Sequence, residues 1–329
     1  MLKFIIKRLL ISSVILFFVM LVVYTLMHSL PTSYVEQMAR ELSTKPGSQK
    51  SASQWLAELN AQYGMDKGIL EGFFVWLKAA IRGEFGDSWY YSIPVLEQFN
   101  KVIWNSFYLG VAVFILEIFI AIPLGVAAAR KQYSVTDYTV TVVALVGISL
   151  PTFFIATVFK LIFSVKLGWF DISGMRGRNY HNLNDVQKFF DVAKHYVLPI
   201  MTLTVISIGG LMRYTRTNML EVLNSDYIRT ARAKGLPERK VINHHAFRNT
   251  LIPLVTILGG SLPGLFSGAL MTETLFALEG IGYTSYHAMV AGDIPFTMFY
   301  LSFMAILTLL GNLMSDILYA VVDPRVRIA

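Results

Sequence analysis

The sequence predicts an all-α membrane protein with about six transmembrane helices. Hydrophobic residues make up 55% of the 329 residues and charged residues only 15%, whereas soluble domains carry about 25% charged residues. The mean hydropathy of +0.55 is correspondingly high. Several apolar segments also reach the roughly 20 residues that a helix needs to cross the hydrocarbon core of a bilayer.

The first predicted helix occupies residues 1–30, including a short cytosolic N-terminal end. Lys3, Lys7 and Arg8 precede an apolar run from Leu9 to Leu30. This start is similar to that of a signal peptide, but the run is too long for a signal h-region and ends without a small-residue cleavage site. We therefore expect a retained transmembrane helix.

A polar region, residues 31–103, follows the first helix and is expected outside the cytosol. The piece STKPGSQKSAS is typical of a flexible loop. Two later pieces, WLAELNAQYG and GFFVWLKAAI, have helical amphipathic spacing. These helices are expected on the membrane surface or packed against other helices, because the region is too polar to span a bilayer.

The rest of the chain, residues 104–329, is expected to contain five further membrane helices. The apolar candidates are residues 104–129, residues 137–163, a segment that starts with YVLPIMTLTVISIGGLM at residue 196, residues 251–272, and residues 296–322.

The distribution of Lys and Arg predicts the orientation, since short cytosolic loops are enriched in both. Arg130 and Lys131, the basic stretch before residue 250, and Arg325 with Arg327 in the tail all fall on one side. The segment 276–295 on the other side contains neither residue type. Both termini are therefore expected in the cytosol.

The stretch DYIRTARAKGLPERK, residues 226–240, separates two apolar segments. Each Lys or Arg at the centre of a bilayer costs about 2.5–3.5 kcal/mol, so this stretch must lie outside the lipid. Gly235 is a natural helix stop, and Pro237 is tolerated in the first turn of the next helix. We expect a helix, a glycine corner and a second short helix.

Two interpretations of this basic stretch stay open on the residues alone. It either merely fixes the topology or forms a docking surface, where small residues before Gly235 would let another protein come close. Nucleic acid is not an expected partner despite the formal charge of +7, because the stretch lacks interleaved aromatic residues and a recognisable binding fold.

A longer segment around this stretch carries a specific resemblance. MRYTRTNMLEVLNSDYIRTARAKGLPERKVINHHAFRNTLIPLV resembles the cytoplasmic coupling loop of bacterial ABC importer permeases, in the version of the dipeptide/oligopeptide family and its B-type membrane subunit. RGEFGDSWYYSIPVLEQF, TETLFALEGIGYTSYHAMVAGDIP and NLMSDILYAVVDPRVR are similar to other segments of that family. The resemblance covers nearly the whole chain except residues 36–60 and 171–194. It departs at Glu279, where the family usually has a proline.

The resemblance implies a type I ABC importer permease fold (the MetI-like fold), with residues 213–250 as the coupling loop. In the family this loop is a helical elbow that docks on the ATPase subunit. Arg229-Thr230-Ala231 take the place of Glu-Ala-Ala of the general family. The implied coupling residues are Asp226, Arg229, Thr230, Ala231, Arg232, Ala233, Lys234 and Gly235.

The resemblance also implies the partners and the location. These are a second homologous permease subunit, two ABC ATPase subunits that hold ATP and magnesium, an extracytoplasmic solute-binding protein, and the lipid bilayer of a bacterial cytoplasmic membrane. The implied function is ATP-driven import of di- or oligopeptides, coupled through residues 226–248. Nickel, metal chelates and glutathione are alternative substrates of the same branch, and a secondary transporter is a more remote alternative.

Three charged residues fall within apolar segments. Glu117 lies midway through the second predicted helix, and an intramembrane carboxylate marks a functional site unless a neighbouring helix satisfies it. We expect a hydrogen bond from a neighbouring helix. Asp316 is expected to pair with Asn312 or with an arginine near the inner end of the last helix. The ammonium group of Lys160 is expected to reach outward to water.

Gly260, Gly264 and Gly268 recur four residues apart in the fifth predicted helix, with Pro263 among them. Small residues at this spacing let helices approach closely, and proline kinks a helix. Close packing at a subunit interface, a gate near the pore, and packing within the subunit all remain open.

No motif for catalysis or for cofactor binding is visible. The sequence contains no Walker lysine loop, His-Glu-x-x-His or nucleophile elbow. It has no cysteine, and His244 and His245 are adjacent, so their side chains point in different directions on a helix. We therefore expect no catalytic residue, no metal site and no directly bound cofactor.

Overall fold

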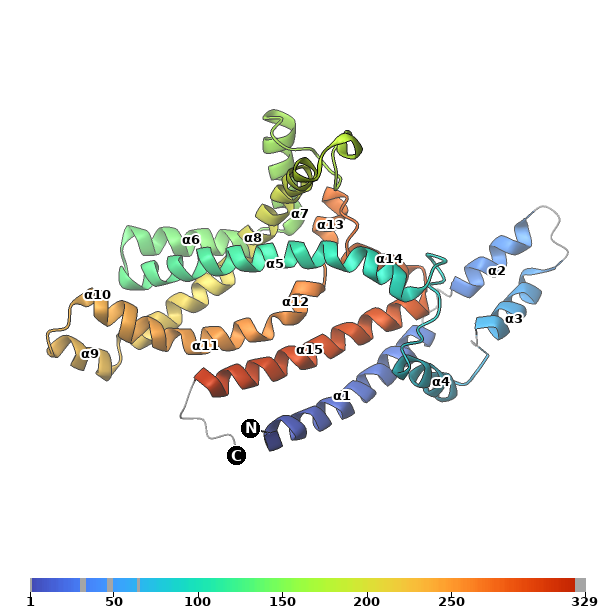
Figure 1. The fold of residues 1–329 in the computed structure, drawn as a ribbon, viewed down its shortest axis with the longest axis horizontal. Coiled ribbons are helices and arrows are strands. Elements are labelled where there is room, and N and C mark those ends of the chain that lie inside the picture. Colours follow the sequence, from blue (N-terminus) through green and yellow to red (C-terminus); the bar gives the residue numbers. More distant parts are fainter. Residues whose placement is uncertain (1, 30–33, 46–49, 64–65, 323–329) are drawn as a thin grey trace. The chain divides into compact units, whose positions relative to one another are not determined.

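The computed structural model describes residues 2–29, 34–45, 50–63 and 66–322, and these residues form helices joined by turns (Figure 1). This confirms the all-α prediction. The chain divides into two compact units. Residues 1–104 and 281–309 form the first unit, and residues 105–280 and 310–329 form the second.

The first unit contains the N-terminal helices and the region expected outside the cytosol. Its elements are α1 (Leu2–Ser29), α2 (Tyr34–Thr44), α3 (Ala52–Tyr63), α4 (Ile69–Ile81), the start of α5 (Val95–Arg130), α14 (Ile281–Val290) and the start of α15 (Ile294–Val322). The helices α3 and α4 coincide with the two amphipathic pieces, which confirms that prediction. Of the piece STKPGSQKSAS, residues 46–49 lie outside the described residues, whereas its first two residues end α2 and its last two begin α3.

Aromatic side chains build the core of the first unit. The Phe73 side chain on α4 is completely buried. Its ring centroid lies 5.5 Å from that of Phe17 and 5.7 Å from that of Tyr24, both on α1. The amphipathic helix α4 therefore uses its apolar face to pack against α1.

The second unit contains the other membrane segments and the basic stretch. Its elements are the rest of α5 and α15, α6 (Val135–Ser149), α7 (Thr152–Phe159), a π-helical segment (Lys160–Lys166), a 3-10 turn (Tyr180–Asn182), α8 (Asp185–Leu223), α9 (Asp226–Ala233), α10 (Glu238–Lys240), a second π-helical segment (Val241–Ala246), α11 (Phe247–Gly260), α12 (Leu262–Phe266) and α13 (Leu270–Phe276).

The segment 137–163 does not form one straight helix, so this part of the prediction is wrong. The helices α6 and α7 meet at 103°. Leu150 between them has an extended backbone with ψ of 133°, because the following proline, Pro151, disfavours the α-helical conformation of the residue before it.

The segment 251–272 is also interrupted. The helices before and after Ser261 are bent by 42°, and α12 ends before Gly268, which has a left-handed φ of +74°. Gly260, Gly264 and Gly268 are therefore not on one continuous helix.

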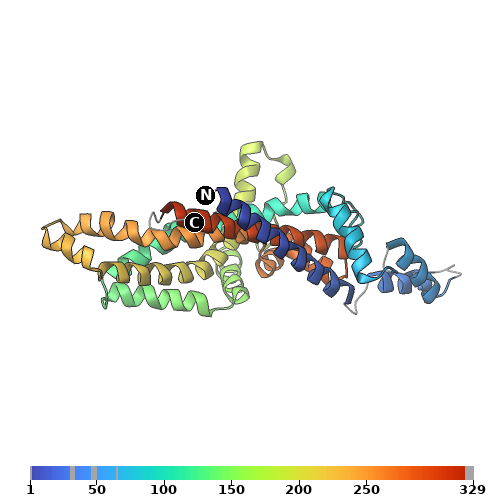
Figure 2. The same cartoon turned by 90° about the horizontal axis from the view of Figure 1, so that it is seen from below.

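The core of the second unit lies between α5, α6, α8 and α11. Apolar side chains of all four helices meet there, among them Ala121, Ala144, Met212 and Leu254. Figures 1 and 2 show α6 and α8 running side by side. Their backbones approach closely, since a β-carbon added to Gly209 would lie 2.6 Å from the carbonyl oxygen of Ala144.

Four helices within the described residues are long and apolar enough to cross a membrane, and the number rises to six if each bent pair counts as one span. The two bent pairs are the α6–α7 region and the region from Glu238 to Phe276. This agrees with the multi-pass membrane prediction. Arg325 and Arg327 lie outside the described residues.

Candidate functional site

The basic stretch folds as a helix, a glycine corner and a second short helix, which confirms the predicted local structure. Gly235, with φ of +72°, follows α9. Its N–H donates to the carbonyl of Arg232 at 2.9 Å, and the N–H of Leu236 donates to the carbonyl of Ala231 at 3.4 Å. These are the two hydrogen bonds of a Schellman motif, so the glycine closes α9 and turns the chain toward α10. We call residues 226–240 the elbow.

One face of the elbow is packed against the ends of the longer helices. Ile228 is completely buried and Ala231 is 8% exposed. Both pack with Met219 at the end of α8 and with Val241 and Ala246 before α11. Ala231 therefore holds the elbow in place, and its side chain is not available for the expected surface contact.

The opposite face of the elbow is exposed. Arg232 reaches across the glycine corner to Glu238, with nitrogen–oxygen distances of 2.8 and 3.2 Å. Arg229 lies 3.4 Å from Asp226, one turn earlier. Exposed ion pairs contribute about 0–1 kcal/mol, so these pairs orient side chains more than they stabilise the fold. The exposed candidate residues are Asp226, Arg229, Thr230, Arg232, Ala233, Lys234 and Gly235.

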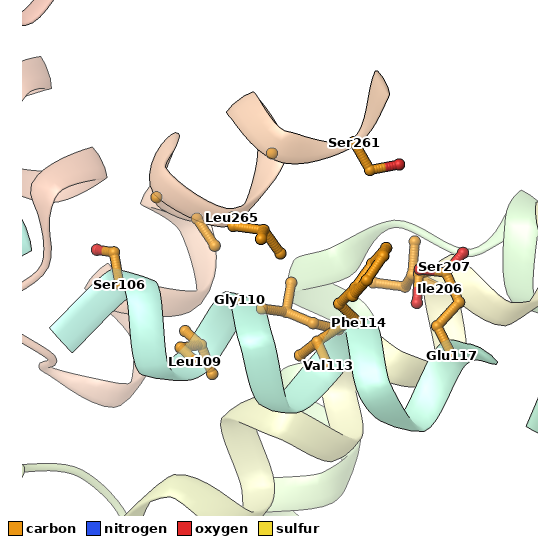
Figure 3. Close-up of a pocket in the computed structure, with 14 residues that line it drawn as sticks. Ser106, Leu109, Gly110, Val113, Phe114, Glu117, Ile206, Ser207, Ser261 and Leu265 are labelled. Carbon is orange, nitrogen blue, oxygen red and sulfur yellow. The ribbon is translucent and has the colours of Figure 1, made fainter. Parts of the chain in front are cut away.

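A cavity of about 310 Å³ contains the predicted intramembrane carboxylate, and we call it the Glu117 cavity. One face of α5 forms its floor, and α8 and the connection from α11 to α13 form its walls (Figure 3). Most of the lining is apolar. The lining residues are Ser106, Leu109, Gly110, Val113, Phe114, Glu117, Leu203, Ile206, Ser207, Ser261, Gly264, Leu265, Gly268 and Ala269.

Glu117 is half-buried at the edge of this cavity. Among the described residues its carboxylate has neither a hydrogen bond nor an ion pair. The expected hydrogen bond from a neighbouring helix is therefore not seen in this part of the chain.

The candidate glycines have different surroundings. A β-carbon added to Gly260 or Gly264 would meet no atom within 4 Å, so neither marks a close contact between helices of this chain. Gly264 and Gly268 line the Glu117 cavity, and Pro263 lies 3.0 Å from a β-carbon added to Gly311 on α15. A role at a gate or a subunit interface stays a prediction.

Lys160 and Asp316 are two other charged residues within predicted membrane segments. The Lys160 ammonium group donates to the carbonyl of Leu275 at 2.6 Å and lies 5.5 Å from the Phe276 ring centre. Lys160 is partly buried and bonds to α13, and its reach outward to water stays a prediction. Asp316 lies on α15, and its expected partner stays a prediction.

Sequence reasoning missed a buried ion pair between α6 and α8. The Arg216 guanidinium contacts both carboxylate oxygens of Asp137, at 2.5 and 2.7 Å. Asp137 also accepts the N–H of Tyr133 at 2.9 Å. Ser134 at the N-cap of α6 is a sequence signal for the helix start, but nothing in the sequence indicates the distant arginine.

Sequence reasoning also missed two buried carboxylates. Glu273 on α13 accepts the hydroxyl of Ser106 at 2.7 Å and the N–H of Ala269 at 3.0 Å. Asp293, before α15, accepts the hydroxyl of Ser88 and the N–H of Phe296 at 3.1 Å. The two serines are 167 and 205 residues away from these carboxylates in the chain, so only the fold brings each serine to its carboxylate.

Comparisons with known proteins agree with the predicted fold class. Residues 121–328 match the family described as the inner membrane component of binding-protein-dependent transport systems, and residues 1–98 match the N-terminal part of such membrane components. The chain is 37% identical over 267 residues to the oligopeptide transport system permease protein AppB of Bacillus subtilis, covering 81% of this chain and 83% of the relative.

Two other relatives are matched over nearly their full length. The chain is 34% identical to the dipeptide transport system permease protein DppB of Escherichia coli, over 99% of both chains. It is 31% identical to the oligopeptide transport system permease protein OppB of Haemophilus influenzae, over 99% of this chain and 100% of the relative. With its membrane helices and the two family matches, the chain belongs to the inner-membrane permease components of binding-protein-dependent ABC transport systems.

Proposed function

We propose that this chain is a transmembrane subunit of an ATP-driven importer of di- or oligopeptides. The observation that carries the proposal is the exposed, glycine-closed elbow between α8 and α11. The relatives that span 99% of the chain are named as dipeptide and oligopeptide permeases. A second, homologous permease completes the translocation path, and two ATPase subunits, which hold ATP and magnesium, bind the elbows.

The length of α8 supports a cytosolic position for the elbow. Its 39 residues extend about 58 Å at 1.5 Å per residue, whereas the hydrocarbon core is about 30 Å thick. Part of α8 therefore extends beyond the bilayer. The basic residues of the elbow favour the cytosolic side, which agrees with cytosolic termini and with an extracytoplasmic region after α1 that meets a solute-binding protein.

The packing of the elbow supports a role in transmitting motion. Ile228 and Ala231 are buried against Met219 and Val241, so α9 is fixed to the end of α8 and to the start of the segment that leads into α11. A displacement of α9 by an ATPase subunit therefore moves both longer helices. The path then alternates between inward-facing and outward-facing states.

Charge reversal on the exposed face tests this proposal. We expect Arg229→Glu to abolish co-purification of the ATPase subunits and peptide uptake, while the chain still inserts into the membrane. The matched control is Lys188→Glu, which disrupts another pair of the same spacing, Lys188 with Asp185 at 3.7 Å. If Arg229→Glu retained the ATPase subunits and transported at the wild-type rate, the elbow would not be the docking site.

The transported substrate needs a separate measurement. Mass spectrometry of the ligand that co-purifies with the cognate binding protein distinguishes a peptide from nickel, a metal chelate or glutathione. ATP-dependent uptake of the identified ligand into vesicles that contain the complete complex then tests import directly. Uptake driven by an ion gradient without ATP would instead indicate a secondary transporter.

A further inference from the structure

The polar side chains of the Glu117 cavity are arranged as hydrogen-bond acceptors toward the cavity in this structure. Three serines line the cavity, and each hydroxyl donates elsewhere. Ser207 donates to the carbonyl of Thr204 at 3.2 Å, and Ser261 to the carbonyl of Ile257 at 3.1 Å. Ser106 donates to Glu273. Since a hydroxyl oxygen keeps acceptor lone pairs after it donates, these serines offer acceptors to an occupant of the cavity.

Glu117 adds a carboxylate, which is also an acceptor when ionised. No lysine, arginine or histidine is among the lining residues of the described chain. Taking a carboxylate out of water is costly unless a positive charge or a hydrogen-bond donor compensates. The lining therefore favours an occupant that brings both a positive charge and N–H donors.

The backbone near Gly268 supports access to this cavity from water. Gly268 and Ala269 lie between α12 and α13, where the chain is not helical, and both line the cavity. Non-helical backbone at membrane depth occurs only where it is buried in protein or lines a water-filled cavity. The non-helical backbone at Gly268 and the Glu117 carboxylate thus line the same cavity.

The remaining walls are apolar. Phe114 on α5, Ile206 on α8 and Leu265 on α12 are among the lining residues (Figure 3). A volume of about 310 Å³ is at the lower end of the range for small-molecule sites, about 300–1,000 Å³. It is suited to one charged group with a short apolar substituent.

We propose that the Glu117 cavity is a subsite of the translocation path that binds a primary ammonium group of the peptide in transit. The ammonium group donates to Glu117 and to the oxygens of Ser207 and Ser261, and the adjoining side chain packs against Phe114 and Leu265. This inference rests on the proposed peptide-import function. Both the amino terminus and a lysine side chain supply this group.

Carbodiimide coupling tests the contact directly. The complete complex in lipid nanodiscs is given binding protein, ATP, trialanine and a membrane-permeant carbodiimide. Amide formation joins the Glu117 carboxyl carbon to the peptide nitrogen, and the carbodiimide takes up the lost water and becomes a urea. We expect mass spectrometry to find trialanine attached to Glu117. N-acetyl trialanine should give no adduct, and an N-acetyl peptide with one lysine shows whether a side-chain amine also binds.

Uptake by variants provides the second readout. We expect Glu117→Gln to lower uptake of trialanine about tenfold or more, as for loss of one partner of a desolvated charge pair. The control Glu97→Gln removes an exposed carboxylate on the same helix and should leave uptake unchanged. Methylamine coupling to Glu117 checks that the carboxyl is reachable.

Several results would overturn the inference. These are an unreactive Glu117 toward methylamine, no trialanine adduct in a wild-type complex that imports trialanine, or an unchanged uptake by Glu117→Gln. If Glu117→Gln slowed uptake but the wild type formed no adduct, Glu117 would have a structural role. That result would also overturn the inference. A wild-type complex that imports no peptide would instead refute the proposed function.

Discussion

Arg216 on α8 and Asp137 on α6 form a bidentate ion pair, although 79 residues separate them in the sequence. The Asp137 side chain is 4% exposed and that of Arg216 is 26% exposed. Removing one partner of a buried pair costs about 3–5 kcal/mol, because it leaves an uncompensated buried charge. We expect Arg216→Met to lower the free energy of unfolding by close to this amount and to lower the melting temperature of the purified complex.

The double variant Asp137→Asn with Arg216→Met provides the control. It removes both charges, so it should be more stable than Arg216→Met alone. If the two losses were simply additive, the pair would contribute no coupling energy and the interpretation would be wrong.

Neighbouring glycines on α8 allow a matched test of helix packing. A β-carbon on Gly209 would meet the backbone of α6, whereas one on Gly210 would meet no atom within 4 Å. We expect Gly209→Ala to destabilise the fold by about 1–3 kcal/mol through overpacking. Gly210→Ala should be neutral or stabilising by up to about 1 kcal/mol, because alanine favours helix. Thermal unfolding in the same detergent measures the melting temperatures of both variants. Equal melting temperatures would contradict the predicted contact.

The left-handed backbone of Gly235 predicts a graded series at the elbow. A side chain has room there, since no atom lies within 4 Å of an added β-carbon, but the left-handed conformation costs roughly 1–2 kcal/mol for most residues. Gly235→Asn should be tolerated best. Gly235→Arg should lower the number of peptides imported per ATP hydrolysed while insertion stays normal. A wild-type ratio for Gly235→Arg would contradict the proposed coupling role.

Asp293 predicts a pH dependence of stability. Burial raises the pKa of Asp293, although hydrogen bonds from Ser88 and from backbone N–H groups act in the opposite direction. The folded protein therefore binds this proton more tightly than the unfolded chain, whose aspartate pKa is about 3.9. The contribution of Asp293 to stability is greatest below that value and falls as the pH rises through the folded pKa.

We accordingly expect Asp293→Asn to gain stability relative to the wild type as the pH rises from about 4 to about 7. Melting temperatures of both proteins across this range measure the difference, and Asp87→Asn, at an exposed position, is the control. A difference that changes in the opposite direction would mean that hydrogen bonds outweigh burial.

Much of the fold follows from local properties of the sequence. The helices α1, α5, α8 and α15 are long apolar runs, and their length alone predicts membrane spans. The elbow was also predictable, because Gly235 and Pro237 act on the backbone within a few residues. The basic side chains of the elbow also place it outside the lipid, and this conclusion requires no knowledge of tertiary contacts.

The rest depends on contacts between distant residues. Apolar composition continues across Pro151, so it gives no measure of the 103° bend there. Small and basic residues alternate around Ala231, and this pattern does not predict which side chains face inward. The inward face is set by packing against Met219 and Val241. The side-chain partners of Asp137, Glu273 and Asp293 likewise come from distant parts of the chain.

The π-helical segment Val241–Ala246, between α10 and α11, has a mechanical consequence. Its i→i+5 hydrogen bonds enclose one residue more than an α-helical turn. Conversion of this turn to regular α-helix, with the surplus residue passed along the chain, rotates one end against the other by about 100° and shifts it by about 1.5 Å. Such a conversion would turn α11 relative to the elbow and would require the buried side chains of Val241 and Ala246 to repack.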